Sequence, residues 1–263
     1  MSTKKQIVLE TKNLDIGYCT KKGLHCLAEN LNITAQKKKL ICLLGKNGIG
    51  KSTLLKTLSK TLHPLKGDVL VDAVNLKKAS PQFLAKKMGL VFTERIPEGQ
   101  LTVFELVALG RQPYTNWLCK LSPLDLQKVN AALEQVHIIS IRDKKYDELS
   151  DGQLQKVMIA RALAQDTEII VLDEPTAHLD IHHTIEVFKL LQKLVETTNK
   201  TIIISTHEIN LALKLADEFW LLLENEFISG DLNELIAINA FEKLFPKKQI
   251  LFDAASKQFH IQP

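Results

Sequence analysis

The pattern of hydrophobic residues changes along the chain, and in its second half these residues gather in short, almost wholly apolar runs. The runs cover residues 169–172, 201–204 and 220–223, and helical segments such as Thr184–Leu194 separate them. Short apolar strands that alternate with helices are typical of a parallel sheet covered on both faces. A similar run at 40–44 is followed by a glycine-rich loop and a helical stretch that begins at Lys51.

The segments before and after that loop have other patterns. Up to about residue 35, short apolar runs alternate with turn residues, which predicts an antiparallel β subdomain. The middle of the chain is helical, and helix starts are marked by Thr102 and by hydroxyl residues that precede a proline, at Ser80 and Ser122. From Ser122 the apolar residues follow the spacing of one helix face, at Leu126, Val129, Leu133 and Val136.

These patterns predict a single α/β domain over residues 1–263, because the chain shows no internal repeat, low-complexity segment or long linker. We expect a core formed by residues 1–80 and 165–230. A helical insertion is expected at about 81–164, and a short C-terminal extension at 231–263.

Charge and cysteine content narrow the function classes. The 263 residues carry a formal net charge of +4, and the densest basic run is Lys37–Lys39. Nucleic-acid-binding domains usually carry a larger clustered basic stripe, so we expect no nucleic-acid partner. The four cysteines form no C-x-x-C pair and no metal-type spacing, and free thiols suit a reducing compartment.

The sequence also lacks membrane signals. Its first residues have no apolar stretch of the kind that a signal peptide needs, and no apolar run approaches the roughly 18 residues of a membrane-spanning helix. We therefore expect a cytoplasmic protein, whose membrane role would come through its partners.

The glycine-rich loop carries the strongest chemical signal. Residues Gly45–Ser52 match the pattern G-x-x-x-x-G-K-[ST] of a phosphate-binding loop. Glycines let the backbone wrap around phosphate oxygens, and the helix N-terminus at Lys51 adds its positive dipole end. Lys51 would reach the β and γ phosphates of ATP, and Ser52 would bind Mg²⁺.

A second element is needed to hold the magnesium ion and to activate water. The apolar run 169–172 ends in Asp173 and Glu174. Parallel sheets place ligands at the carboxyl ends of their strands, so both carboxylates are expected beside the phosphate loop. Asp173 would hold Mg²⁺ through its water shell, and Glu174 would polarise the attacking water.

At this point the chain resembles the family of ABC-type ATPases, and the likeness runs from about residue 7 to 230. Leu149–Gln153 is similar to the signature loop of that family, usually Leu-Ser-Gly-Gly-Gln, with Asp151 in place of the first glycine. The resemblance implies that Tyr18 stacks on adenine, that His207 contacts the γ-phosphate and that the loop 177–180 crosses a dimer interface. It implies a nucleotide site formed by Tyr18, Gly45, Asn47, Gly48, Gly50, Lys51, Ser52, Thr53, Ser150, Gly152, Gln153 and Asp180.

One position departs from the family pattern. The family usually has glutamine between the core and the helical insertion, where the side chain touches the metal, whereas this chain has Glu94. A carboxylate near a polyphosphate adds repulsion unless it coordinates magnesium directly. Our hypothesis is that Glu94 binds the metal and couples the insertion to it.

Three histidines raise a different possibility. His178, His182 and His183 could bind a metal, since residues four apart share a helix face. We favour a loop without metal, because no complete set of four ligands is apparent in the sequence.

The resemblance also implies partners and a role. One phosphate loop and one signature loop per chain imply a homodimer with two ATP molecules at its interface, attached to permease subunits on the cytoplasmic face of the membrane and served by a substrate-binding protein. The stretch 102–114, followed by Trp117, is similar to ATPases of iron–siderophore, haem and cobalamin importers. The alternative is a soluble ABC ATPase that acts on ribosomes or DNA.

Overall fold

A six-stranded sheet forms the centre of the computed structural model, which describes residues 6–20, 23–92, 99–118, 120–245 and 250–261. The strand order is β11–β10–β4–β9–β8–β7. Five strands run parallel, and β11 pairs antiparallel with β10 at one edge. The strands are β4 (Leu40–Leu44), β7 (Met88–Val91), β8 (Ile169–Asp173), β9 (Thr201–Ser205), β10 (Glu218–Leu222) and β11 (Phe227–Gly230). The predicted parallel sheet is confirmed.

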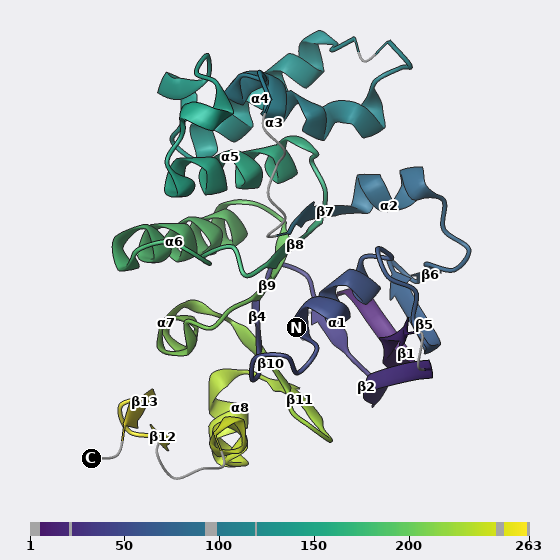
Figure 1. Cartoon of the computed structure of the whole chain (residues 1–263), viewed down its shortest axis with the longest axis vertical. Coiled ribbons are helices and arrows are strands. Elements are labelled where there is room, and N and C mark those ends of the chain that lie inside the picture. The colour runs from purple at the N-terminus through teal and green to yellow at the C-terminus, as the bar shows by residue number, and fades with distance from the viewer. Residues whose placement is uncertain (1–5, 21–22, 93–98, 119, 246–249, 262–263) are drawn as a thin grey trace, which may run out of the picture.

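The central strands are apolar throughout because both faces of the sheet are covered. On β4, Leu40, Cys42 and Leu44 belong to one core and Ile41 and Leu43 to the other, and all five are fully buried. Helices α6 (Ile181–Thr197) and α7 (Ile209–Leu215) cover one face, and α1 (Lys51–Leu58) covers the opposite face (Figure 1). Each leucine or isoleucine buried in this way stabilises the fold by about 1.5–3 kcal/mol.

The N-terminal strands form the predicted antiparallel sheet. Its order is β2–β1–β5–β6, with β3 paired to β1, and α1 lies between this sheet and the central one (Figure 1). The strands are β1 (Ile7–Thr20), β2 (Gly23–Leu31), β3 (Thr34–Gln36), β5 (Lys66–Val71) and β6 (Val74–Asn75).

The helical insertion is shorter than predicted, because β7 belongs to the central sheet and the insertion therefore begins after Val91 rather than at residue 81. Helix α2 precedes β7. The predicted caps are present, since Ser80, Thr102 and Ser122 each accept a hydrogen bond from a backbone N–H in the first helical turn. The elements are α2 (Pro81–Lys87), α3 (Val103–Ala108), η1 (Leu109–Tyr114), α4 (Pro123–Gln135), η2 (Ile139–Ile141), η3 (Tyr146–Glu148) and α5 (Asp151–Ala164).

The buried face of α4 differs from the predicted one at a single position. Val129 and Leu133 are buried as expected, but Leu126 is 41% exposed. Asp125 is buried in its place, and its carboxylate is 2.8 Å from the Arg111 guanidinium. A charged pair therefore occupies a place that the apolar pattern assigned to leucine.

The C-terminal extension packs against α7 and the central core. It comprises α8 (Leu232–Ala237), η4 (Ala240–Leu244), β12 (Ile250–Asp253) and β13 (Gln258–Ile261). The rings of Phe241, Phe252 and Phe259 contact one another, and the side chain of Asn210 on α7 bonds both backbone groups of Phe259. Within the described residues, no helix has the length and apolar character needed to cross a membrane.

Candidate nucleotide site

The phosphate-binding loop connects β4 to the start of α1. Gly48 and Gly50 adopt φ angles of 75° and 112°, in the left-handed region that favours glycine. A Cβ atom at Gly45 would lie 2.5 Å from the carbonyl oxygen of Leu222, so no other residue fits there without movement. The loop is thus a tight glycine turn that leads into a helix N-terminus, which is the arrangement that binds phosphate.

Lys51 points its ammonium group back over this loop. The Nζ atom donates to the carbonyl oxygens of Gly45 and Lys46 at 3.0 and 3.2 Å, and the residue is buried. Burial lowers the pKa of Lys51, while the nearby carboxylates of Glu174 and Asp173 act in the opposite direction. A cation held by neutral carbonyls and facing two carboxylates is well placed to bind polyphosphate.

The two carboxylates emerge at the carboxyl end of β8, as predicted. Asp173 is buried, and its Oδ1 accepts a hydrogen bond of 2.6 Å from the hydroxyl of Ser205 at the end of β9. The same hydroxyl accepts a 2.9 Å bond from the backbone N–H of Glu174, whose φ angle is 47°. Ser205 therefore fixes both acidic residues. This role of Ser205 was not predicted from the sequence, although the serine ends an apolar strand and could have been noticed on that ground.

His207 and Tyr18 complete the cavity. The Nε2 atom of His207 lies 2.5 Å from Oε1 of Glu174. The cavity has a volume of about 330 Å³, and Tyr18, at its margin, is 41% exposed. The residues that line it are Tyr18, Leu27, Asn47, Gly48, Gly50, Lys51, Ser52, Thr53, Glu174 and His207. Residues that are up to 189 positions apart in the sequence thus line the same cavity.

The predicted signature residues lie elsewhere. Within the described part of the chain, none of Ser150, Gly152, Gln153 and Asp180 lines this cavity. Ser150 caps α5 through a reciprocal pair of hydrogen bonds with Gln153, and Asp180 caps α6. Glu94 falls outside the described residues, so its expected contact with metal remains a hypothesis.

In the structure a carboxylate lies beside two of the three histidines. Ligand atoms of His182, His183 and Glu186 lie within 4.8 Å of one another. However, Glu186 binds the Lys156 ammonium at 2.8 Å, and His183 binds Asp180 at 2.9 Å. These partners account for two of the three side chains without a metal ion.

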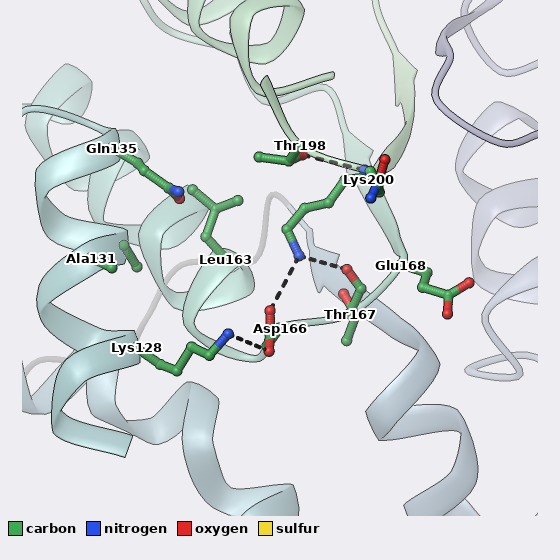
Figure 2. Close-up of a pocket in the computed structure, with 11 residues that line it drawn as sticks. Lys128, Ala131, Gln135, Leu163, Asp166, Thr167, Glu168, Thr198 and Lys200 are labelled. Carbon is green, nitrogen blue, oxygen red and sulfur yellow. Dashed lines mark hydrogen bonds and ion pairs between the residues drawn. The ribbon is translucent and has the colours of Figure 1, made fainter. Parts of the chain in front are cut away.

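A second cavity, of about 300 Å³, lies at the opposite end of the parallel strands, where β8 and β9 begin. Figure 2 shows Lys128 and Lys200 pointing at Asp166 from two sides, at 2.8 and 3.9 Å. Lys200 also donates to the carbonyl oxygen of Thr167. Both ammonium groups are therefore already paired with protein oxygen atoms, so this cavity does not resemble an open phosphate-binding site.

The donors beside the phosphate loop fit magnesium. Asp173 supplies a buried carboxylate and Ser52 a hydroxyl, and Mg²⁺ prefers oxygen ligands of this type together with water and phosphate. A strand, a glycine loop and a helix, with a neighbouring strand that ends in carboxylates, define a P-loop nucleoside triphosphatase.

The comparisons with known proteins identify the family. The family model described as ABC transporter matches residues 28–177. The achromobactin transport ATP-binding protein of Dickeya dadantii is 42% identical over 80% of this chain and 76% of its own length. The ferric enterobactin transport ATP-binding protein of Escherichia coli is 32% identical over 93% and 89%, respectively. This chain belongs to the ABC transporter family and is an ATP-hydrolysing subunit of that family.

Solved structures agree with this assignment. A metal-chelate type ABC transporter in an inward-facing conformation matches with a TM-score of 0.78 and 27% identity, over 97% of this chain and 96% of that one. A dimeric bacterial ABC transporter cassette matches with a TM-score of 0.73 and 29% identity, over 85% and 98%. The predicted fold class is confirmed.

Proposed function

We propose that two copies of this chain bind two molecules of Mg²⁺-ATP between them and power an importer of iron–siderophore complexes or of related haem or cobalamin cargo. One observation carries the proposal. Among the described residues, the cavity is lined by most of the phosphate loop, by Glu174 and by His207, but the signature residues Ser150 and Gly152 lie outside it. A second copy would supply its own signature loop to complete each site.

Within each site, the residues have distinct tasks. Lys51 would neutralise the β and γ phosphates, and the backbone of Gly48 and Gly50 would wrap around them. Tyr18 would stack on adenine at the exposed margin of the cavity. Asn47 and Thr53, which also line the cavity, would contribute further nucleotide contacts.

The hydrolytic step would depend on Glu174. Its carboxylate would orient the attacking water, and His207, already 2.5 Å from it, would contact the γ-phosphate and keep Glu174 in place. Ser52 and Asp173 would hold magnesium, which supplies charge neutralisation to the phosphates when bound. Ser150, Gly152 and Gln153 of the partner copy would bind the γ-phosphate from the other side, and Asp180 would cross the interface.

The cargo follows from the relatives, whose names refer to achromobactin and ferric enterobactin transport. Cargo of this kind is selected by a permease and a substrate-binding protein, so this chain would lie on the cytoplasmic face of the membrane as a peripheral subunit. No nucleic-acid partner is proposed.

The dimer is tested with Glu174→Gln, which retains ATP but cannot activate water. Light scattering with Mg²⁺-ATP should show that Glu174→Gln is a dimer. The control is Glu168→Gln, at the opposite end of β8, which should hydrolyse ATP as the wild-type protein does. A Glu174→Gln protein that stays monomeric with ATP would contradict the proposal.

Co-purification with a multi-helix permease, followed by uptake assays with radiolabelled ferric siderophore, haem and cobalamin, would identify the cargo. Uptake of none of the three would refute the cargo assignment.

A further inference from the structure

The N-terminal turns of α5 and α6 lie against each other, and His183 is at their contact. Its backbone N–H donates to Oδ1 of Asp180 at 2.8 Å, and its ring atom Nδ1 lies 2.9 Å from Oδ2 of the same carboxylate. Hydrogen bonds from His183, the backbone one foremost, hold the pKa of Asp180 below its ordinary value. Asp180 thus stays ionised at neutral pH and binds both the backbone and the ring of His183.

The imidazole of His183 also lies against the signature loop. An ideal Cβ atom built at Gly152 would lie 2.8 Å from Cδ2 and 3.1 Å from Cγ of His183. Gly152 is buried, although Ser150 and Asp151 beside it are exposed. The missing side chain of Gly152 therefore gives the ring its place, and a larger residue at this position would have to displace the ring.

A second contact runs parallel to the first, one turn further along both helices. The Lys156 ammonium on α5 lies 2.8 Å from Oε2 of Glu186 on α6. Two contacts on adjacent turns join the start of α5 to the start of α6. The signature loop and the Asp180 loop therefore form one unit within a single copy of the chain.

We propose that His183 is a positioning residue, which sets the spacing between the signature loop and Asp180 so that both reach the partner copy together. The inference rests on the proposed ATP-bound dimer. In that dimer, the signature loop faces one nucleotide while Asp180 crosses the interface. Closure of the signature loop on ATP would then move Asp180 with it, and this connection would link the two ATP sites.

Three variants test the inference. His183→Ala removes the contacts of the ring with Asp180 and with Gly152. His183→Asn keeps a side-chain donor for Asp180 but removes the ring from Gly152. The matched control is Lys189→Ala, because Lys189 is an exposed residue further along the same helix. The backbone cap of α6 by Asp180 persists in all three variants, so each is expected to fold.

For both His183 variants we expect kcat to fall about 10-fold to 100-fold, because a displacement of catalytic groups by about 1 Å can cost as much as about 100-fold. The KM for ATP should stay within about twofold of wild type, because Tyr18 and the phosphate loop are unchanged, and the Hill coefficient for ATP should fall towards one. Lys189→Ala should match wild type in all three quantities. A general loss of structure would instead alter KM and the thermal midpoint together.

A Gly152→Ala change provides a second test, since its methyl group would collide with the ring. It should cost less activity in the His183→Ala background than alone. The inference is overturned if His183→Ala keeps kcat within twofold of wild type, if only KM changes, or if the two substitutions are additive. If Glu174→Gln dimerises with ATP, these outcomes refute only the positioning role of His183. If Glu174→Gln stays monomeric, the dimer on which both proposals depend is refuted.

Discussion

Ser205 offers the sharpest test of the site, because a single hydroxyl joins the two acidic residues. In Ser205→Ala, Oδ1 of Asp173 loses a 2.6 Å donor and the N–H of Glu174 loses a 2.9 Å acceptor. The N–H keeps its 3.2 Å bond to the Ser205 carbonyl oxygen, which the substitution does not remove. The substitution therefore mainly removes a hydrogen-bond donor from the carboxylate of Asp173.

The magnitude follows from the burial of this bond. Ser205 is fully buried and Asp173 is 4% exposed, so water does not readily replace the lost donor. A hydrogen bond to a charged group contributes about 1.5–3 kcal/mol. The free energy of unfolding should fall by about that amount. If the bond is equally needed to orient Asp173 and Glu174 in the transition state, kcat should fall about 10-fold to 100-fold, since each 1.4 kcal/mol corresponds to about tenfold.

The assay is steady-state phosphate release at several Mg²⁺ concentrations, together with urea denaturation. Thr201→Val is the matched control, because Thr201 begins the same strand, is equally buried, and uses its hydroxyl in bonds with Gln36 and Lys38. The control should lose stability but keep kcat. Unchanged kcat and Mg²⁺ dependence in Ser205→Ala, or an equal loss of kcat in Thr201→Val, would refute the reasoning.

Two further predictions concern stability. Arg111→Ala leaves the buried Asp125 carboxylate without its cation, and urea denaturation should show a loss of about 3–5 kcal/mol. Hydrogen bonds from Ser122, aided by Arg111, lower the pKa of Asp125, so its stabilising contribution is complete above the unfolded value of about 3.9 and is lost as pH falls through the folded-state pKa, as acid denaturation should show. Phe241→Ala removes a fully buried ring that packs against Phe219 at 5.7 Å, and should cost about 3–5 kcal/mol in the same denaturation assay. Losses below about 1 kcal/mol in either variant would contradict these estimates.

The predictions from sequence succeeded where local pattern and local chemistry agree. The apolar run at 40–44 and the glycine loop needed only their own residues to be recognised, and the capping hydroxyls of Ser80, Thr102 and Ser122 were equally local. The prediction failed for Leu126, because the burial of Asp125 depends on Arg111, which is 14 residues away. The insertion boundary was also misplaced, because the pairing of β7 with β8 joins residues about 80 positions apart.

The sequence by itself determined that this protein has a phosphate loop, a pair of acidic residues after a buried strand, and a parallel sheet between helices, since each of these is encoded by contiguous residues with a fixed period. The tertiary structure decided that Ser205 joins the carboxylates and that His207 reaches Glu174. It also decided that His183 rests on Gly152. These contacts depend on which strands and helices become neighbours, and that choice is made by burial of apolar faces over the whole fold rather than by any local stretch.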